Sequence, residues 1–481
     1  MNKKMIFSTL GKLVFSEALL MILPLITALC YKETAVALAF LFTIALALFV
    51  GFVLYFGCKT ENTVIYAKEG FIIVAFGWLI MSAIGAVPFV ISGDIPSYVD
   101  AFFETVSGFT TTGASILTDI ESLSRGGLFW RSFTHWVGGM GVLVFVMAVL
   151  PSVSDRSIHI MRAEMPGPIV GKIVPRARET ARILYIIYFA MTALQTALLL
   201  VGGMPLFDSI LHAFGTAGTG GFGIKSDSIA SYTPYLQWVI TIFMFLFGVN
   251  FNLYYLILMK RIRSACKSGE FWAYFGITAI AIVVICINIL PTFDNFGDAF
   301  RASAFQVASI ITTTGFSTVD FNVWPTLSKT VLLCLMFVGA CAGSTGGGFK
   351  VTRVVMLFKS IKQELKRMIH PRSVSAVKFE GKVLDKVTLN SVSTYLAVYM
   401  ISLIAIVFCI SFEPFDFETT FSAALSCFNN IGPGIGAVGP MGSYAEYTGF
   451  SKIVLSFAML LGRLEIYPLL IALTPSTWTK K

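Results

Sequence analysis

Long apolar segments alternate with short polar ones along the whole 481-residue chain. Apolar runs of eighteen or more residues recur, which is typical of membrane-spanning helices and not of soluble cores. We predict about ten spans, which begin near Leu13, Ala35, Phe71, Phe129, Ile183, Leu236, Trp272, Lys329, Ser391 and Ser451. The pattern therefore predicts an all-α membrane protein.

Four short loops that carry glycine interrupt the apolar pattern. Two of them share the string TTTG, at 110–113 and 312–315. We align Thr219-Gly220 and Ile431-Gly432 with this string in the other two. The loops read SGFTTTGAS (107–115), GTAGTGGFG (215–223), SIITTTGFS (309–317) and CFNNIGPG (427–434). Four such loops inside a membrane can close around an axis and replace the water shell of a small cation with backbone carbonyls.

Each loop follows a segment that is too short to span a bilayer. The residues from Asp100 to Thr112, at about 1.5 Å per helical residue, cannot cross a hydrocarbon core of about 30 Å. We therefore expect a half-length helix that ends at the loop, after which the chain turns back. Non-helical backbone at membrane depth is tolerated only where it is buried in protein or lines a water-filled cavity. The loops thus indicate an aqueous pathway.

An acidic residue stands near the start of each half-length helix: Asp100, Asp208, Asp298 and Glu418. A carboxylate there can cap free N–H groups and complements the positive end of the helix macrodipole. The negative ends then point at the loops and favour a cation. The alternative is that the small residues only pack helices together, but four strings in the same context favour a pore.

The order of span, short helix, loop and span repeats four times. We predict four modules around a central pore, at 71–151, 180–260, 271–360 and 391–474. A two-span addition, residues 1–58, precedes them.

The basic residues are concentrated in loops that would share one side of the membrane. The net charge is +9, and the segments 155–182, 260–270 and 350–386 carry much of the excess, whereas the opposite loops are mainly acidic. The positive-inside bias places these segments, and the N-terminus with Lys3 and Lys4, in the cytoplasm. Because membrane orientation accounts for the charge, we predict no nucleic-acid partner.

Neither cysteine nor histidine usage indicates a resident metal site. The chain has eight cysteines and four histidines, without CxxC spacing. The catalytic patterns HExxH and GxSxG do not occur in the sequence either. We therefore predict that the protein is not an enzyme and that it uses no organic cofactor.

The loops and several other strings resemble the Trk/Ktr/HKT superfamily of potassium-uptake proteins, most closely its bacterial TrkH branch. The resemblance covers nearly the whole chain, including the two-span addition. It implies a potassium-selective pathway made by four non-identical modules, a homodimer, and a cytosolic nucleotide-binding regulatory subunit of the RCK type. The further matching strings are HWVGGMG (135–141), GSTGGGFK (343–350) and GRLEIYP (462–468).

The resemblance also assigns a selectivity filter that binds K⁺. Its glycines would be Gly113, Gly220, Gly315 and Gly432, and its flanking carbonyl donors Thr112, Thr219, Thr314 and Ile431. Some sodium-transporting relatives have serine at the first of these glycines, so glycine in all four loops favours potassium. The fourth loop departs from the Thr-Gly pattern, and filter field strength depends on every quadrant.

A second glycine-rich string interrupts the last span of the third module after Ala342. It resembles a phosphate-binding loop, but Phe349 stands where that motif needs lysine. Three successive glycines hold a helix poorly, which indicates either a simple kink or, as the resemblance suggests, a flexible gate below the filter. The gate residues would be Gly343, Ser344, Thr345, Gly346, Gly347 and Gly348.

Arg463 lies within the last apolar span. A charge at the bilayer centre costs about 2.5–3.5 kcal/mol on insertion scales, so it should face protein or water. It can pair with nearby Glu465, or it can reach the glycine loop, and the resemblance favours the second. For His135, His212 and Arg301 we expect structural hydrogen-bonding roles.

The resulting hypothesis is potassium uptake through a gated, carbonyl-lined filter, driven by the membrane potential. The alternative is a secondary carrier that couples cation movement to H⁺ or Na⁺. We expect a multi-pass protein of the bacterial inner membrane, in contact with membrane lipids.

Overall fold

The computed structural model describes residues 2–58, 66–141, 177–371 and 376–478. This part of the chain is mainly helical, and the all-α class is confirmed. Its only strands, among the described residues, form the antiparallel hairpin of β1 (Lys378–Phe379) and β2 (Lys382–Val383). The basic segment predicted at 155–182 lies outside the described residues up to position 176.

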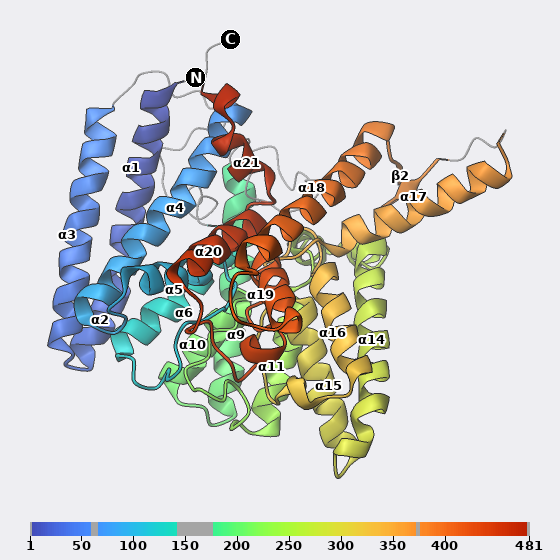
Figure 1. The fold of residues 1–481 in the computed structure, drawn as a ribbon, viewed down its shortest axis with the longest axis horizontal. Helices are drawn as coiled ribbons and strands as arrows, with labels where there is room; N and C mark the ends of the chain where they lie inside the picture. Colours follow the sequence, from blue (N-terminus) through green and yellow to red (C-terminus); the bar gives the residue numbers. More distant parts are fainter. Residues whose placement is uncertain (1, 59–65, 142–176, 372–375, 479–481) are drawn as a thin grey trace.

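The two-span addition consists of α1 (Lys3–Leu20), α2 (Ile22–Cys30) and α3 (Thr34–Gly57). These helices form the blue group at one edge of the molecule (Figure 1). α1 and α3 lie in close contact, because a Cβ atom on Gly11 would stand 2.9 Å from the carbonyl oxygen of Gly51. Small residues permit such close helix contacts in membranes.

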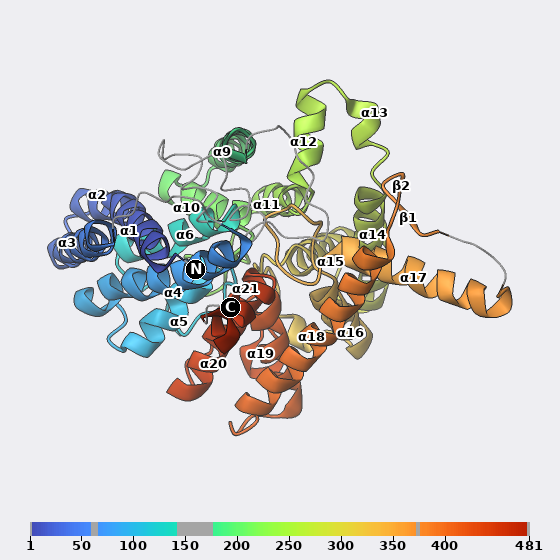
Figure 2. The ribbon, with the colours of Figure 1, turned by 90° about the horizontal axis from the view of Figure 1, so that it is seen from above.

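Each of the four modules contains a long first helix, a short helix and a second helix. The first helices are α4 (Ala67–Ser92), α9 (Ala177–Val201), α14 (Gly269–Ile289) and α18 (Lys386–Ile410). The short helices are α5 (Tyr98–Phe109), α10 (Leu206–Ala217), α15 (Phe296–Ile311) and α19 (Phe417–Asn429). The second helices are α6 (Arg125–Gly139), α11 (Pro234–Phe247), α16 (Thr326–Val338) and α20 (Gly449–Arg463). Seen from above, the modules follow one another around a centre (Figure 2), as predicted.

Three of the second helices, α11, α16 and α20, are interrupted, and the prediction of ten continuous spans is wrong in this respect; the residues that follow α6 from position 142 lie outside the described residues. Helices occur at all ten predicted places, but six are long and apolar enough to cross a membrane, or seven if a bent pair counts as one span, within the described residues. The bent pair is α11 and α12 (Phe251–Leu258), which meet at 90°. α17 (Val351–Ile369) and α21 (Tyr467–Leu473) follow the breaks after α16 and α20.

Backbone conformation explains two of these breaks. Gly339 has φ +71°, and Glu465 and Ile466 have φ +56° and +65°. An α-helix cannot continue through the left-handed region. The remaining short elements are α13 (Ile262–Ala265), η1 (Leu290–Thr292), η2 (Phe321–Val323), η3 (Gly436–Val438) and η4 (Pro475–Thr477).

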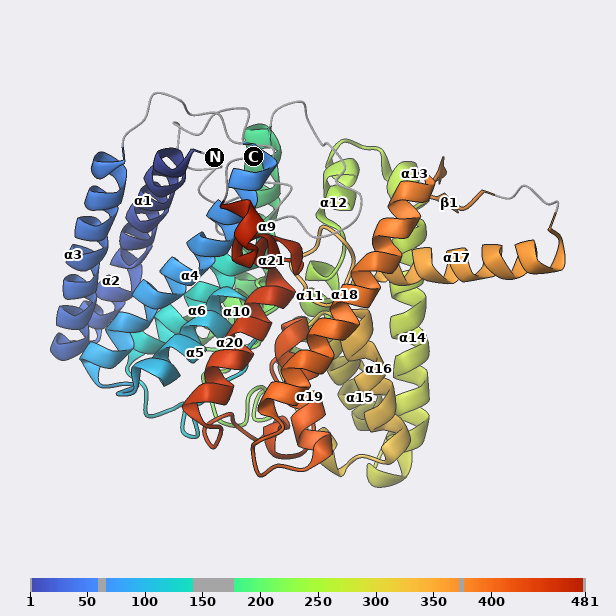
Figure 3. The ribbon, with the colours of Figure 1, turned by 45° about the horizontal axis from the view of Figure 1, so that its top comes forward.

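α17 projects outward from the group of membrane-spanning helices. It extends away from the group of spans, roughly across the direction of α14 (Figure 3). The two described ends of the chain lie toward the same end of the molecule (Figure 1).

Candidate functional site

The short helices carry an acidic residue in their first turn, as the sequence suggested. These residues are Asp100, Asp208, Asp298 and Glu418. None of the four is the N-cap residue. The side chains of Ser97, Asn295 and Asp416 accept from the backbone N–H of Asp100, Asp298 and Thr419, and Pro205 precedes α10 without a side-chain cap. The four helices have 12 to 16 residues, so each stops short of crossing the bilayer.

Each short helix ends in the same backbone turn. A backbone N–H in each loop donates to a carbonyl five residues earlier, at 2.8–3.0 Å. The donors and acceptors are Thr112 with Ser107, Gly220 with Gly215, Thr314 with Ser309, and Ile431 with Ser426. The residue before each donor is left-handed, with φ from +55° to +57° at Thr111, Thr219, Thr313 and Asn430. The residue after each donor is a glycine with φ from +75° to +98°, at Gly113, Gly221, Gly315 and Gly432.

This turn shifts the second loop by one residue relative to the sequence alignment. Gly220 occupies the place of Thr112, and Gly221 occupies the place of Gly113. The alignment of Thr219-Gly220 with the TTTG string is therefore wrong. The loop has glycine at 218, 220, 221 and 223, and only the backbone torsions show which of them takes the left-handed position.

The four loops meet in a closed ring of backbone. A Cβ atom on Gly113, Gly221 or Gly315 would overlap the carbonyl oxygen of the residue that precedes the glycine in the next loop. These oxygens belong to Gly220, Thr314 and Ile431. A Cβ atom on Gly432 would stand 2.7 Å from the carbonyl oxygen of Thr112, which completes the circle. Glycine is required at each place by both the torsion and the space.

Hydroxyl and amide groups brace the ring. Thr110 and Thr112 share a hydrogen bond of 2.8 Å, and Thr312 and Thr314 share one of 2.7 Å. The fourth loop has no such threonines. Its Asn430 instead donates from Nδ2 to Thr112 Oγ1 at 3.0 Å, and so joins the fourth module to the first.

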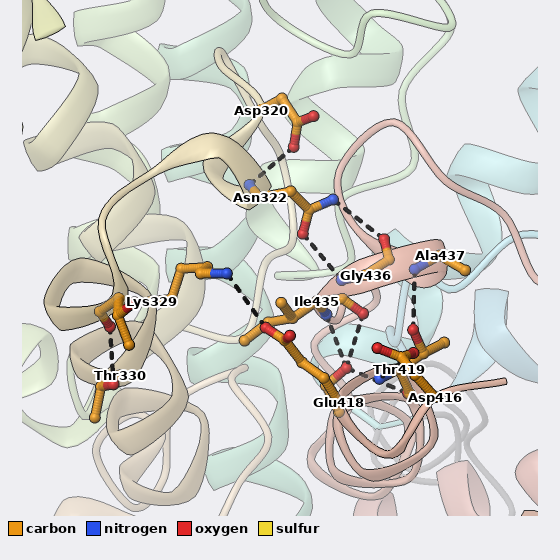
Figure 4. A network of polar contacts seen from close by, with 12 residues as sticks. Asp320, Asn322, Lys329, Thr330, Asp416, Glu418, Thr419, Ile435, Gly436 and Ala437 are labelled. Atoms are coloured by element: carbon orange, nitrogen blue, oxygen red, sulfur yellow. Dashed lines mark hydrogen bonds and ion pairs between the residues drawn. The ribbon is translucent and has the colours of Figure 1, made fainter.

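Polar contacts also tie neighbouring modules beyond the ring. Asn322 and Gly436 exchange two hydrogen bonds, of 3.0 and 3.1 Å, between the third and fourth modules (Figure 4). Ser317 donates from its N–H to Ser228 Oγ at 3.2 Å, between the second and third. Tyr444 donates from its N–H to the Ser115 carbonyl at 2.9 Å, between the fourth and first.

A buried ion pair within the first module also contacts the second module through Arg131. Arg131 Nε lies 2.6 Å from Glu104 Oε1, and both side chains are almost fully buried. Arg131 also donates to the Gly223 carbonyl at 2.8 Å, and its guanidinium lies 3.5 Å from the ring centroid of Phe222. The carboxylate of Glu104 accepts from Ser115 Oγ and the Ile116 N–H at 2.9 and 3.0 Å. The pair therefore fixes the segments that follow the first and the second loop of the ring.

A cavity opens on one side of the ring. Its volume is about 200 Å³, and it is lined by the four left-handed glycines and by the segments that follow them. Arg131 and Lys225 also reach it. The cavity is wide enough for several waters, so a hydrated cation can approach the ring from this side.

A loop of the third module fills the space on the other side. It runs from Gly339 to Lys350, between α16 and α17, and begins earlier than the predicted break after Ala342. The N–H of Gly347 donates to Thr313 Oγ1 at 2.6 Å. A Cβ atom on Gly346 would stand 2.9 Å from the Thr312 carbonyl. The predicted gate residues 343–348 therefore lie directly against the ring.

Arg463 holds this loop from the fourth module. Its Nη1 donates to the Thr345 carbonyl at 2.8 Å, and its Nη2 donates to the carbonyls of Gly138 and Gly139 in the first module. Glu465 is paired with Arg353, so of the two contacts considered for Arg463, the structure shows the one with the loop. A cavity of about 40 Å³ remains between the loop, Arg463 and Gly139.

Several side chains of this site were not singled out from the sequence. Lys350 is buried and donates from Nζ to the Gly346 carbonyl. Arg353 pairs with Glu465. A charged residue within an apolar stretch was the available signal for both. His135, which was singled out from the sequence, stacks on Phe222 with ring centroids 4.1 Å apart, and a Cβ atom on Gly220 would overlap its ring.

The hydrogen-bonding roles expected of three polar residues are met by two of them. His212 Nδ1 lies 2.8 Å from the Asp208 carbonyl, and Arg301 pairs with Asp298 at 2.6 Å. Neither ring nitrogen of His135 has a hydrogen-bond partner among the described residues. Its contact with Gly220 is therefore one of packing.

The fold and this site define a class: a membrane transport protein with four modules around a backbone-lined passage. The chain belongs to the TrkH family, because the family model described as "TrkH: Cation transport protein" matches residues 37–272 and 273–480.

Named relatives and a solved structure agree with this assignment. The chain is 37% identical to the Trk system potassium uptake protein TrkH of Salmonella typhimurium, over 99% of this chain and 100% of that one. It is 34% identical to the Trk system potassium uptake protein TrkG of Escherichia coli K12, over 97% of each. The crystal structure of the potassium transporter TrkH from Vibrio parahaemolyticus superposes with a TM-score of 0.90 at 32% identity, covering 100% of both chains.

Proposed function

We propose that this protein carries potassium ions into the cell through the ring of carbonyls, driven by the membrane potential. The observation that carries the proposal is that each of the four ring glycines lies against a carbonyl oxygen of the next loop, so that the loops form a closed ring. These oxygens belong to Thr112, Gly220, Thr314 and Ile431. Four converging carbonyl oxygens replace the water shell of a desolvated cation. The relatives at 34–37% identity are named for potassium uptake.

The helix ends reinforce this preference for a cation. The four short helices point their C-termini at the ring, and each such end carries about half a negative charge. Carbonyl oxygens coordinate K⁺ without any charged ligand. Among the described residues no group of three or more His, Cys, Asp or Glu side chains is placed to hold a metal ion, so the backbone is the candidate ligand.

In this proposal the loop 339–350 is the gate, and its contact with the ring blocks the pathway. The loop lies against the ring at Thr312 and Thr313, and Arg463 adds a positive charge on the same side. A cation that has passed the ring meets both an obstruction and electrostatic repulsion. Movement of the loop is then the step that opens the pathway.

The positions of the basic residues indicate which side of the inner membrane each end of the protein faces. α17 carries Lys359, Lys362 and Lys366, and the N-terminus carries Lys3 and Lys4. By the positive-inside bias α17 and the N-terminus face the cytoplasm. A cytosolic nucleotide-binding subunit of the RCK type then docks here, and it reaches the protein beside the gate.

A homodimer explains the apolar face of α17. Large apolar side chains spaced three and four residues apart lie on this helix and are 56–70% exposed: Phe358, Ile361, Leu365 and Met368. This spacing places them on one face of the helix, and contiguous exposed apolar patches mark interaction sites. A second copy of the chain is the occupant that the proposal commits to. Ile361→Asp with Leu365→Asp should then give a monomer by native mass spectrometry, while Lys366→Asp on the polar face should leave the dimer.

The experiment that tests the transport proposal is a flux assay in reconstituted vesicles. With a negative-inside potential we expect uptake of K⁺ and Rb⁺ to exceed that of Na⁺ and Li⁺. Flux that follows an imposed proton or sodium gradient at zero potential would favour the secondary carrier instead. Vesicles that contain protein with Gly315→Asp serve as the control, because the side chain would fill the ring while the outer contacts remain.

A further inference from the structure

Glu270 contacts the interrupted second helices of two modules, the second and the third. It lies in the first turn of α14, in the third module, and its side chain is 5% exposed. Its Oε2 accepts from Asn250 Nδ2 at 3.5 Å. Asn250 stands in the bend between α11 and α12, where the second module is interrupted. The carboxyl group therefore faces the interior of the site and not the lipid.

The same carboxyl group binds both flanks of the loop 339–350. Glu270 Oε1 accepts from the backbone N–H of Ala342 at 2.6 Å, near the start of the loop. It also accepts from Thr352 Oγ1, two residues after the loop ends. One oxygen atom thus joins the beginning of the loop to the first turn of α17. A buried carboxylate that accepts several hydrogen bonds gives stronger bonds than a neutral acceptor does.

A second carboxyl group connects Glu270 to the hairpin of β1 and β2. Glu380, in the turn of this hairpin, accepts through Oε1 from Ser268 Oγ and from the backbone N–H of Glu270, both at 3.1 Å. Lys359 of α17 donates from Nζ to the Lys378 carbonyl at 2.9 Å. The hairpin is therefore fixed both to the start of α14 and to α17.

We propose that Glu270 is a positioning residue that clamps the two flanks of the loop 339–350, and that Glu380 links this clamp to the hairpin 378–383. The inference rests on the proposed function of this loop as the gate. Its new content is the route by which a force at the hairpin reaches the loop. Pulling the hairpin away from α14 removes an acceptor from the helix end that carries Glu270, and loosens the clamp at Ala342 and Thr352.

The geometry distinguishes this role from general stabilisation of the fold. Both donors converge on Oε1, and an amide oxygen at the same place still accepts from both. Glu270→Gln should therefore keep most of the clamp, whereas Glu270→Ala should lose it. Thr352→Val removes one donor and keeps the shape of the side chain. Glu413→Ala is the matched control: Glu413 is 8% exposed and accepts from the Thr448 N–H and Oγ1 at 3.0 and 2.6 Å, away from the loop.

The test is hydrogen exchange of the full-length protein in lipid vesicles, read on peptides that cover 339–353. Loss of a hydrogen bond to a charged group corresponds to a change in opening of about tenfold or more. We expect at least that acceleration in Glu270→Ala, a smaller one in Thr352→Val, Glu380→Ala and Glu270→Gln, and near wild-type exchange in Glu413→Ala. Exchange in α19 should be unchanged in all of them.

Two outcomes would overturn the inference. Wild-type exchange of 339–353 in both Glu270→Ala and Thr352→Val would show that there is no clamp, and wild-type exchange in Glu380→Ala alone would remove the link to the hairpin. If Glu270→Ala does not fold, Thr352→Val and Glu380→Ala carry the test. Potassium flux through the same samples distinguishes failure of the clamp inference from failure of the gate proposal. Faster exchange without faster flux supports the clamp and contradicts the role of the loop as a gate.

Discussion

Arg463 donates a hydrogen bond of 2.8 Å to the carbonyl oxygen of Thr345, and so fastens α20 of the fourth module to the loop of the third. The same guanidinium donates to the carbonyls of Gly138 and Gly139. One side chain therefore ties three chain segments together below the ring of carbonyls. Its hydrogen bonds hold the loop below the ring, and its positive charge lies in the same region.

Replacing Arg463 should open the pathway. Arg463→Ala removes the bonds to the loop and the repulsive charge, so we expect faster Rb⁺ uptake without any cytosolic partner, measured per folded protein in vesicles. Arg463→Lys keeps the charge but cannot reach three carbonyls at once, and should give an intermediate rate. A well-folded Arg463→Ala protein with wild-type uptake would show that the contact is only structural.

Shortening the loop should have an effect that overlaps with that of Arg463→Ala. Deletion of residues 344–347 removes the segment that lies against Thr312 and Thr313, and should also raise the resting uptake. Because both changes act on one element, their logarithmic effects should not add in the double variant. Full additivity, measured in the same uptake assay, would mean that Arg463 acts elsewhere.

Serine in the ring should weaken the preference for potassium. Gly113→Ser and Gly221→Ser each introduce a side chain at a left-handed backbone position that lies against a carbonyl of the next loop. The strain, about 1–3 kcal/mol, moves that carbonyl, and we expect a lower ratio of Rb⁺ to Na⁺ uptake.

The control for the ring variants is Gly223→Ala. Gly223 lines the same cavity, but it is not left-handed and a Cβ atom there would stand 3.2 Å from its nearest neighbour. Its uptake ratio should match the wild type. An unchanged ratio in Gly221→Ser would support the alignment that places Gly220 in the glycine position.

The Arg131–Glu104 pair should be important for stability. Arg131→Ala leaves a buried carboxylate without its partner, which typically costs about 3–5 kcal/mol. We therefore expect a large fall in the unfolding temperature in detergent. The double variant Arg131→Met with Glu104→Gln removes both charges and should recover part of the loss. If the double variant is no more stable than Arg131→Ala, the unpaired charge is not the cause.

The sequence was sufficient to predict the repeated architecture. The half-length helices were visible because the distance from Asp100 to Thr112 is too short for a span. The ring glycines of three loops were visible because small polar residues stand between apolar segments. The N-terminal addition followed from apolar runs alone. Each of these features depends on residues that are close together in the sequence, so the sequence pattern alone predicts it.

The breaks and the long-range contacts could not be predicted in the same way. The string around the bend after Phe247 is apolar on both sides, so its hydropathy continues through a 90° change of direction. The left-handed glycine of the second loop is one of four nearby candidates, and its identity depends on contact with Thr314. The role of Glu270 depends on Ala342 and Thr352, which lie far away in the sequence.

The most direct test of the central claim is the reversal potential of Arg463→Ala protein in a planar bilayer, with K⁺ on one side and Na⁺ on the other at equal pH. If the ring of carbonyls at Thr112, Gly220, Thr314 and Ile431 selects the ion, the reversal potential should lie far from zero, with the K⁺ side negative. It should move toward zero when Gly221→Ser is added. A potential near zero without that change, or one that follows an imposed proton gradient, would contradict the account.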